Sequence, residues 1–393
     1  MTPGARIAAA IDILDSILEG RPAEQALTGW ARRSRFAGSK DRAAIRDHVF
    51  DALRRKRSAA AMGGGMSGRG LMLGLLRQSG TDPEAIFSGE GHAPAPIAPH
   101  ETGRALTKMT APEALDLPDW LWPAFQAELG ADAGRSAQAL RDRAPVFARV
   151  NLRASTISEA VQALKDDGIE TEPHPDVHAA LEVTANARRL RQSAAYLDGR
   201  IELQDANSQA IVQALPLRDG LSVLDYCAGG GGKTVAMGAR ADLELYAHDA
   251  DHNRMRDLPA RAERASLSVT LTALPDQHAP YDLVLCDVPC SGSGAWRRSP
   301  EGKWGLTKER WLELQQMQDR ILDEAAALTR RDGVLVYATC SVLKDENEGR
   351  VAAFLKRQPE WICTWKKAWQ IDNRGDGFFS AHLTRKEVVN TQL

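Results

Sequence analysis

The second half of the chain is organised as short apolar runs that alternate with segments of helical periodicity. Runs of this length, each followed by a helical pattern, indicate βαβ units and a mainly parallel sheet. We therefore expect an open α/β sheet within residues 201–393. The predicted strands are residues 223–226, 245–248, 269–271, 283–286 and 334–337, and the predicted helices are 234–239, 253–264, 309–328 and 346–357.

The first hundred residues follow a helical pattern instead, and the pattern predicts an all-helical domain over residues 1–105. Three glycines at 63–65 predict the end of its second helix, and a short apolar run follows at 71–76. Residues 79–99 are rich in Pro, Gly and His, which is typical of a domain boundary. The apolar residues at helical spacing are Ile7, Ile11, Leu14, Ile17, Leu18, Ile45, Val49 and Leu53.

Residues 106–200 mix both patterns and predict a small α/β module. Thr110 and Glu113 have the form of a capping box for a helix, and Thr156 and Glu159 have the same form further on. In size the module fits an RNA-binding sheet of the RRM kind, although it lacks the aromatic pair that such a sheet uses to stack bases. Strands are predicted at 146–151, 181–183 and 201–203.

The composition is that of a soluble globular protein with more than one domain, since 393 residues contain 43% hydrophobic and 26% charged residues. No apolar run is long enough to span a bilayer, so we expect a cytoplasmic protein without membrane contact. Five cysteines without a Cys-x-x-Cys pair fit neither a disulfide framework nor a zinc ribbon. We expect reduced thiols, no bound metal and a monomer.

Charge is distributed unevenly along the chain. Residues 1–80 carry 14 Lys and Arg against 7 Asp and Glu, or +7, whereas residues 81–393 carry 36 against 45, or −9. A basic end on a nearly neutral protein favours an anionic partner such as RNA, because Lys and Arg make most phosphate contacts. The alternative is a solvated helix face that binds nothing.

A glycine-rich segment follows the first predicted strand. Glycines permit a tight turn whose amides face a polar ligand, although a tight turn needs glycine with or without a ligand. Asp249 ends the second strand, where an acidic side chain commonly binds the hydroxyls of a ribose. The glycine spacing does not fit a P-loop, which favours an adenosine-containing cofactor over ATP. The segment consists of Cys227, Ala228, Gly229, Gly230, Gly231, Gly232 and Lys233.

Two cysteines, Cys290 and Cys340, each follow a predicted buried strand. One cysteine in such a place is more often a small core residue than a nucleophile. Parallel strands bring their carboxyl ends to one edge of a sheet, so both thiols and the glycine loop are expected in one crevice. A thiolate that adds to C6 of a cytosine makes C5 nucleophilic enough to take a methyl group from a sulfonium donor. Asp287 is suited to stabilising that adduct, and Cys290 to helping remove the C5 proton.

The only long loop in this domain comes directly after Cys290, at residues 291–306. Loops of this length in compact domains are usually functional or disordered. Its basic and aromatic residues favour a role in holding RNA beside a base that has left its stack, with surface residues as the alternative. These candidates are Arg297, Arg298, Lys303 and Trp304.

Over nearly its whole length the chain resembles the Sun/RsmB-type RNA cytosine-5 methyltransferases. Residues 227–234 resemble the cofactor loop of that family, residues 287–292 its proline-cysteine motif and residues 338–341 its threonine-cysteine motif. Similarity extends to residues 149–151, 204–209, 297–304 and 376–379. The resemblance implies a Rossmann-like methyltransferase domain, preceded by a NusB-like helical domain and the small α/β module.

The resemblance also implies roles that spacing does not show. S-adenosylmethionine would lie on residues 227–233, Asp249 and Asp287. Cys340 would be the nucleophile and Cys290 would assist release of the methylated base; DNA cytosine methyltransferases use the proline-cysteine thiol instead. Residues 38–42 resemble the NusB-like domain of members that modify ribosomal RNA, which points to 16S rRNA.

Two positions depart from the family pattern. Gly229 and Gly230 stand where the family usually has Ala-Pro, and residues 272–275 lack the aspartate that often holds the adenine. Two other functions stay open: a non-catalytic RNA-binding assembly factor, and the same chemistry on tRNA.

Overall fold

The computed structural model describes residues 1–386, which divide into two compact units. The first unit contains Met1–Arg143 and Trp296–Gly305, and the second contains Ala144–Ala295 together with the described chain from Leu306. The first unit is therefore discontinuous in sequence. The division into domains at residues 105 and 200 stays a prediction.

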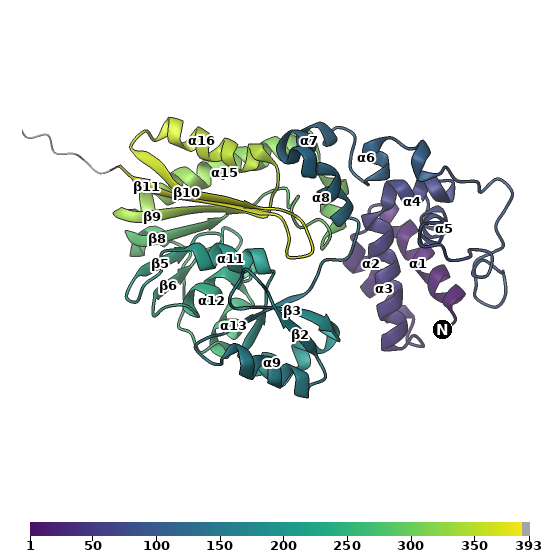
Figure 1. The fold of residues 1–393 in the computed structure, drawn as a ribbon, viewed down its shortest axis with the longest axis horizontal. Helices are drawn as coiled ribbons and strands as arrows, with labels where there is room; N and C mark the ends of the chain where they lie inside the picture. The colour runs from purple at the N-terminus through teal and green to yellow at the C-terminus, as the bar shows by residue number, and fades with distance from the viewer. Residues whose placement is uncertain (387–393) are drawn as a thin grey trace, which may run out of the picture. The chain divides into compact units, whose positions relative to one another are not determined.

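The first unit is helical, as the apolar spacing predicts (Figure 1). Thr2 accepts a hydrogen bond from the Ala5 amide and so caps the first helix. Ile7, Leu14, Ile45 and Leu71 lie in one core with Phe87, so the Pro- and Gly-rich stretch packs onto the helices. The helices are α1 (Pro3–Leu18), α2 (Ala23–Arg33), α3 (Ser39–Arg54), α4 (Lys56–Gly63) and α5 (Gly68–Ser79).

The predicted capping box at Thr110 is wrong. The Thr110 side chain makes no capping hydrogen bond, and Glu113 binds Arg104 instead. The helix there, α6 (Ala111–Ala114), has only four residues, and the longer α7 (Trp122–Leu129) begins with Pro123 in its first turn. The unit is completed by α8 (Ala133–Ala139) and α14 (Pro300–Gly305).

A buried carboxylate joins three segments of this unit. Asp116 is fully buried, and its Oδ1 accepts hydrogen bonds from the amides of Arg57 (2.9 Å) and Ser58 (2.8 Å) in the first turn of α4. Its Oδ2 accepts from Ser58 Oγ (2.7 Å) and from Arg141 Nε (2.8 Å). Asp116 therefore caps a helix and neutralises a buried guanidinium at once.

The second unit begins with a four-stranded antiparallel sheet in the order β2-β3-β1-β4. The capping box of Thr156 and Glu159 is present and confirms that prediction. Strand β2 was not expected, because its mostly exposed residues give no apolar signal. The elements are β1 (Phe147–Val150), α9 (Ile157–Asp166), β2 (Glu170–Pro173), β3 (Ala180–Ala185), α10 (Ala194–Leu197) and β4 (Ile201–Leu203).

A seven-stranded sheet in the order β10-β11-β9-β8-β5-β6-β7 forms the rest of the unit. Strands β5 to β9 run parallel and correspond to the five predicted strands, whereas the antiparallel hairpin of β10 and β11 was not expected. The strands are β5 (Ser222–Asp225), β6 (Glu244–Ala247), β7 (Thr270–Leu271), β8 (Tyr281–Asp287), β9 (Thr329–Thr339), β10 (Trp361–Trp369) and β11 (Phe378–Arg385).

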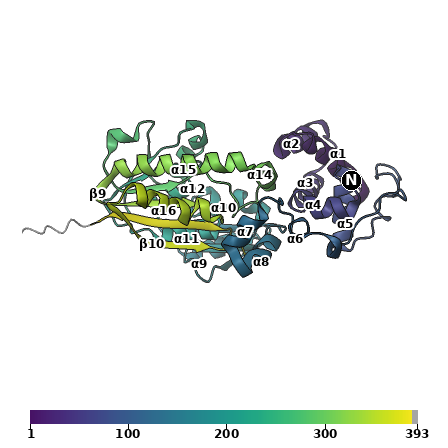
Figure 2. The ribbon, with the colours of Figure 1, turned by 90° about the horizontal axis from the view of Figure 1, so that it is seen from above.

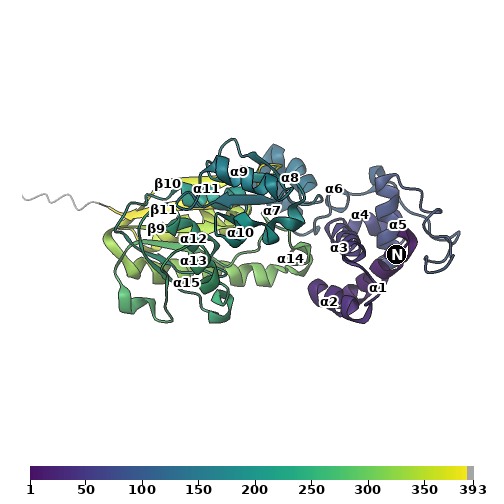
Figure 3. The same cartoon turned by 90° about the horizontal axis from the view of Figure 1, so that it is seen from below.

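Helices cover both faces of this sheet. Figure 2 shows α15 (Lys308–Leu328) and α16 (Glu348–Arg357) on one face, and Figure 3 shows α11 (Ala206–Ala214), α12 (Gly232–Gly238) and α13 (Leu258–Arg264) on the other. Leu322 and Phe354 pack on the first face, and Ile211 and Met237 on the second. No helix in the described part of the chain has the length and apolar character needed to cross a bilayer.

Two predicted helices begin later than expected. The one predicted from residue 253 starts as a 3₁₀ turn, His252–Met255, and α13 follows only at Leu258, since Pro259 has no N–H to continue a helix from the preceding turn. The helix predicted from residue 346 begins at Glu348, which leaves Glu346 in a separate 3₁₀ turn.

Replacing Asp116 by Ala removes the acceptor of a buried guanidinium and of two helix amides. We expect the free energy of unfolding, measured by urea denaturation, to fall by about 3–5 kcal/mol. Asp119→Ala is the matched control, since it removes an Arg57 ion pair whose carboxylate side chain is 70% exposed. That change should lower the same free energy by no more than about 1 kcal/mol. Equal losses for the two variants would contradict this account of Asp116.

Candidate active site

Three strand ends meet at the carboxyl edge of the parallel sheet. Strand β8 lies between β5 and β9, with Asp225 paired to Leu285 and Asp287 paired to Ala338. The chain leaves β5 into the glycine loop, β8 into Cys290 and β9 into Cys340. The structure thus brings together the two thiols, Asp287 and the glycine loop.

The two thiols are direct neighbours, with 3.4 Å between Cys290 Sγ and Cys340 Sγ. The five cysteines of the chain, all within the described residues, form no disulfide. The hydrogen bond to Cys340, together with burial, raises the pKa of the Cys290 thiol well above its usual value. Cys290 therefore keeps its proton, and either sulfur can be the donor in the contact between the two thiols.

A buried carboxylate, Glu346, connects the loops that carry these thiols. Its Oε1 accepts from the Ser291 amide (2.8 Å), and its Oε2 accepts from the hydroxyls of Ser291 (2.5 Å) and Ser341 (2.6 Å). Gln318 Nε2 donates to the same carboxylate (3.1 Å) and to the carbonyl of Pro289 (2.9 Å). Burial raises the pKa of Glu346, although its hydrogen bonds to the serines favour the ionised form. The residues following both cysteines are thus fixed to one group.

The end of β9 is held by a second set of polar contacts. Thr339 Oγ1 donates to Asn347 Oδ1 (2.6 Å), and Asn347 Nδ2 donates to the carbonyl of Ser341 (3.0 Å). Tyr337 donates its hydroxyl to the carbonyl of Glu346 (2.6 Å). Sequence reasoning missed Glu346, Asn347 and Gln318. The available signal was the run of acids and Asn at 345–348, only five residues after Cys340.

Lys233 supplies a positive charge to the site. Its Nζ lies 2.6 Å from Asp287 Oδ2 and 5.4 Å from the centre of the Phe378 ring. Burial opposes the ammonium, but the attraction of Asp287, with a smaller one from Cys340, raises the pKa of Lys233 overall.

The glycine loop takes a turn that side chains would obstruct. Gly229 and Gly231 have φ of 50° and 77°, and a Cβ on Gly231 would lie 2.2 Å from a methyl carbon of Leu258. The Ala228 amide donates to the carbonyl of His248 (2.9 Å), which ties the loop to the end of β6. Burial raises the pKa of the Cys227 thiol, so this third sulfur stays protonated.

Asp249 is fixed by backbone groups at the end of β6. Its Oδ2 accepts from the Gly229 amide (3.0 Å) and pairs with Arg254 (3.2 Å), and its Oδ1 accepts from the Asp251 amide (3.0 Å). After β7, Asp276 is exposed on a 3₁₀ turn. Asp249 is thus a fixed carboxylate at the end of β6, whereas residues 272–276 contain no buried carboxylate.

Asp225 lies beneath the glycine loop and is fully buried. Its Oδ2 accepts from Thr234 Oγ1 (2.6 Å), and its Oδ1 has no hydrogen-bond partner within residues 1–386. Burial raises the pKa of this carboxyl group to about 7. Residues 1–386 contain no group of three His, Cys, Asp or Glu side chains that could hold a metal ion.

The loop candidates for RNA binding lie in the first unit, and most are not available. Arg297 and Lys303 are buried, and Lys303 Nζ donates to the carbonyl of Arg54 (3.1 Å). Half-buried Trp304 donates its Nε1–H to the carbonyl of Leu53 (2.6 Å). Of the four candidates only Arg298 is exposed. Lys303 and Trp304 therefore satisfy the last carbonyls of α3, which explains their side chains without RNA.

Two protein-family models match the chain. The model of the 16S rRNA methyltransferases RsmB/F matches residues 212–384, and that of the ferredoxin-like domain of RsmF/B-like methyltransferases matches residues 117–188. Ribosomal RNA small subunit methyltransferase B of Yersinia pestis is 32% identical over 287 residues. The chain belongs to the RsmB/F family. The matched segment is 68% of this chain and 66% of the Yersinia pestis relative, and the Yersinia pseudotuberculosis protein of the same name matches equally.

Solved structures share the fold of this RsmB/F family member. The structure of PH0851 has a TM-score of 0.75 at 21% identity and covers 98% of this chain and 99% of its own. A methyltransferase homolog from Pyrococcus horikoshii has a TM-score of 0.62 at 23% identity, over 70% of this chain and 98% of its own. NSun6 from Pyrococcus horikoshii, solved with SFG, has a TM-score of 0.61 at 17% identity, over 69% of this chain and 99% of its own.

The buried Asp225 predicts a specific pH dependence of stability. Its pKa is about 7 in the folded chain against 3.8 as the ordinary value, so the folded state holds a proton that the unfolded state has lost between these pH values. The stabilisation is complete below pH 3.8 and is lost as pH rises through 7.

From pH 5 to pH 7 the wild type should lose about 2 kcal/mol of stability relative to Asp225→Asn, which cannot titrate. Urea denaturation of both proteins at pH 5, 6 and 7 measures this difference. A difference that does not change with pH would show that Asp225 has an ordinary pKa in the folded protein.

Proposed function

We propose that this protein is a cytoplasmic enzyme that methylates C5 of a cytosine in small-subunit rRNA, with S-adenosylmethionine as methyl donor and Cys340 as nucleophile. The observation that carries the proposal is the thiol pair at 3.4 Å beside the Lys233–Asp287 ion pair. A buried core cysteine needs neither a second thiol nor a buried ammonium. Family membership supports the same chemistry.

The residues around the glycine loop fit the proposed cofactor. Gly231 has no side chain, and a Cβ at this position would clash with Leu258. Asp249 is held in place by two backbone amides. Residues 227–233 would hold the amino-acid portion and Asp249 the ribose hydroxyls, as in other open α/β sheets. NSun6 of Pyrococcus horikoshii was solved with SFG, an analogue of this cofactor, which supports the assignment. S-adenosylmethionine, when bound, supplies a methyl group on a sulfonium.

The first chemical task belongs to Cys340. Its thiolate forms a bond to C6 of the cytosine, and the electrons of the C5=C6 double bond make C5 a nucleophile that accepts the methyl group. Asp287 is assigned to the ring nitrogen of the proposed adduct. As the ring accepts electrons, this nitrogen takes a proton from solvent, and the Asp287 carboxylate, which pairs with Lys233, would accept a hydrogen bond from the resulting N–H.

The second task is removal of the C5 proton, which we assign to Cys290. Once Cys340 is bound to C6, Cys290 is the sulfur beside the adduct. Its sulfur accepts the C5 proton while its own thiol proton passes to water, so the thiol is restored. The C5=C6 bond then reforms, the C6–S bond breaks, and Cys340 leaves as thiolate.

A basic loop in the first unit is suited to binding the RNA backbone. This basic loop, residues 32–40, includes the end of α2 and the start of α3 and exposes Arg32, Arg33, Arg35 and Lys40, none of which forms an ion pair within residues 1–386. Phe36 in the same loop is 77% exposed. Unpaired cations beside an exposed aromatic ring suit phosphates and unstacked bases. By contrast, Arg46 and Arg57 of this unit are paired with carboxylates.

The decisive experiment measures methyl transfer from labelled S-adenosylmethionine to unmodified small-subunit rRNA, with the product nucleoside identified by mass spectrometry. We expect 5-methylcytidine in the rRNA. Product in tRNA alone would change the substrate assignment. Tight RNA binding without any transfer would make the protein an assembly factor.

The two cysteines should give opposite results in that assay. Cys340→Ala should reduce transfer to below about one thousandth, because the nucleophile is absent. Cys290→Ala should let Cys340 attack but slow release, so that a covalent protein–RNA adduct accumulates on a denaturing gel. Cys363→Ala, which removes a half-buried thiol on β10, should behave as wild type. An adduct that accumulates with Cys340→Ala would reverse the two roles.

The basic loop predicts the salt dependence of RNA binding. For the Arg32→Gln, Arg35→Gln double variant, the slope of log Kd against log salt should fall by about 1.5, since each lost phosphate contact removes about 0.7–0.9. The control variant, Arg310→Gln with Arg330→Gln, removes two exposed cations that already pair with Glu313 and Asp282. An unchanged slope in the loop variant would exclude this loop from the RNA interface.

A further inference from the structure

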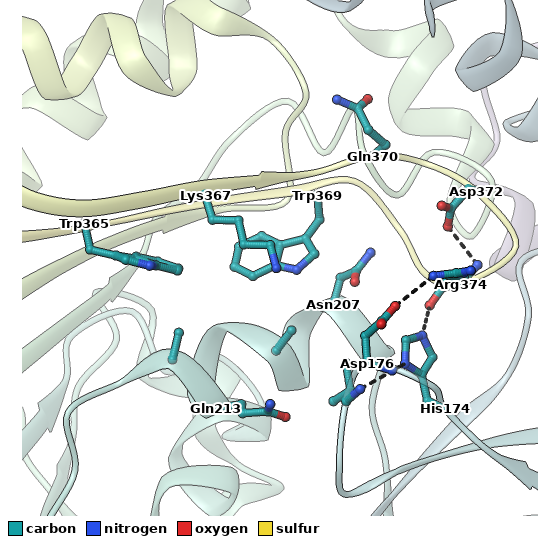
Figure 4. A pocket seen from close by; sticks show the side chains of 13 residues that line it. His174, Asp176, Asn207, Gln213, Trp365, Lys367, Trp369, Gln370, Asp372 and Arg374 are labelled. Carbon is teal, nitrogen blue, oxygen red and sulfur yellow. Dashed lines mark hydrogen bonds and ion pairs between the residues drawn. The ribbon is translucent and has the colours of Figure 1, made fainter.

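A cavity of about 400 Å³ lies in the second unit between β10, α11 and the turn after β2 (Figure 4). Trp365, Lys367 and Trp369 point from β10 into it, and Gln213 of α11 lies opposite. We call it the Trp pocket, defined by Trp365, Lys367, Trp369, Ala210, Gln213 and Ala214. None of these residues belongs to the thiol site or to the glycine loop.

A β-bulge places the two indoles on this face of the hairpin. The pairing of β10 with β11 shifts by one residue between Cys363 and Trp365, so the side chains beyond it change faces. Trp361, before the bulge, stacks edge-on against Phe354 of α16. Trp365 and Trp369, beyond the bulge, face α11 on the opposite side of the sheet.

The two indoles form an aromatic wall on one side of the Trp pocket, with their planes tilted by 55° to each other. Their ring centres are 6.2 Å apart, and Trp365 is backed by His382 at 4.4 Å. Burial lowers the pKa of His382 to about 4, so this backing ring is neutral at pH 7. Opposite the wall, α11 presents Ala210 and Ala214, one helical turn apart. A helix that packs on a sheet usually fills such space with large apolar side chains, and these two alanines leave a slot.

Polar contacts fix the rim at one end of the slot. His174 Nδ1 accepts from the amides of Asp176 and Val177 (both 3.1 Å), so its proton lies on Nε2, which donates to the carbonyl of Arg374 (3.1 Å). Arg374 also pairs with Asp176 at 2.8 Å. The turn after β2 and the loop after β10 are thereby joined, and the slot is present before any ligand arrives.

One cation stands beside the aromatic wall. Lys367 is exposed, with its Nζ 5.1 Å from the centre of the Trp369 ring and no ion pair within residues 1–386. An indole already covered by an ammonium does not favour a second cation, which excludes quaternary amines as the ligand. A flat neutral ring that carries an anionic group fits both the indoles and the Lys367 ammonium. A nucleotide is such a molecule.

A chain of contacts links the Trp pocket to the candidate active site. Asn207 lines the pocket and donates its Nδ2–H to the carbonyl of Asp376 (2.8 Å). Two residues later, the centre of the Phe378 ring lies 5.4 Å from the ammonium of Lys233. An RNA strand that enters both sites would pass the start of β11.

We propose that the Trp pocket holds one unpaired base of the RNA substrate, a different base from the target, stacked on one of the two indoles with its phosphate at Lys367. The inference rests on the proposed function in taking RNA as the substrate. On this proposal, β10 and α11 help to select target cytosines that lie near an unpaired base in the RNA.

Two matched pairs of variants test the pocket. Ala214→Phe fills the slot, whereas Ala368→Phe adds the same ring to the exposed opposite face of β10. Lys367→Gln removes the cation beside the wall, and Lys366→Gln removes its neighbour on the other face. The probe is a single-stranded RNA of 20 nucleotides with one cytosine at its centre, and its Kd is measured by fluorescence anisotropy.

Ala214→Phe should raise the Kd about tenfold, the effect of losing one stacked base, and raise KM without lowering kcat. Lys367→Gln should lower the slope of log Kd against log salt by about 0.7. Ala368→Phe and Lys366→Gln should match wild type, and thermal unfolding should show all four variants folded. If Ala214→Phe does not fold, the salt slopes of Lys367→Gln and Lys366→Gln decide whether RNA binds at the Trp pocket.

The binding series separates the two proposals. A wild type that binds the RNA but transfers no methyl group contradicts the enzyme, while the Kd values still test the pocket. Equal Kd values and salt slopes for wild type and both pocket variants would overturn the pocket, whatever the activity. Equal losses in all four variants would overturn it as well, because they would reflect charge and folding rather than the slot.

Discussion

The 3.4 Å approach of two thiols depends on one buried carboxylate. Strands β8 and β9 bring the chain to the right edge of the sheet, but the residues that follow each strand are irregular and need their own support. Glu346 supplies it, because its two oxygens accept hydrogen bonds from Ser291 and Ser341, which follow the two cysteines. Burying a carboxylate is unfavourable, and the donors gathered around it offset that penalty. The position of Cys340 beside Cys290 therefore depends on a group that lies outside both cysteine motifs.

Much of this architecture could be predicted from periodicity. Helical spacing identified the first unit, and five apolar runs identified the parallel strands, because buried parallel strands are apolar on both faces. From these strand ends, the proximity of Cys290, Cys340 and the glycine loop followed directly. The hairpin of β10 and β11 was missed because a bulge at Thr364 interrupts its alternation. Glu346 was missed because two of its partners, Ser291 and Gln318, lie 55 and 28 residues away in the sequence, and the acids at 345–348 alone do not report those contacts.

Charge in a sequence does not report exposure, and the loop after Cys290 shows why. Lys303 and Trp304 looked like groups for RNA, yet both donate to carbonyls at the end of α3. Burial lowers the pKa of Lys303 to about 7, so its ammonium is held at a real energetic penalty. A helix that ends in the interior needs donors for its last carbonyls, and this structural requirement competes with binding for the same residue types. By contrast, Arg32, Arg33 and Arg35 form no ion pair within residues 1–386.

The discontinuity of the first unit has a consequence for synthesis. Domains generally fold as they leave the ribosome, with N-terminal domains first. This unit takes Trp296–Gly305 into its own structure, with Trp296 only 2% exposed. Its helices up to Arg143 thus emerge early but lack the donors for the end of α3 until the segment after Cys290 has been made. The first unit therefore stays incomplete while the glycine loop and β8 are translated. It can complete its fold only after Cys290 and the segment that follows it have been synthesised.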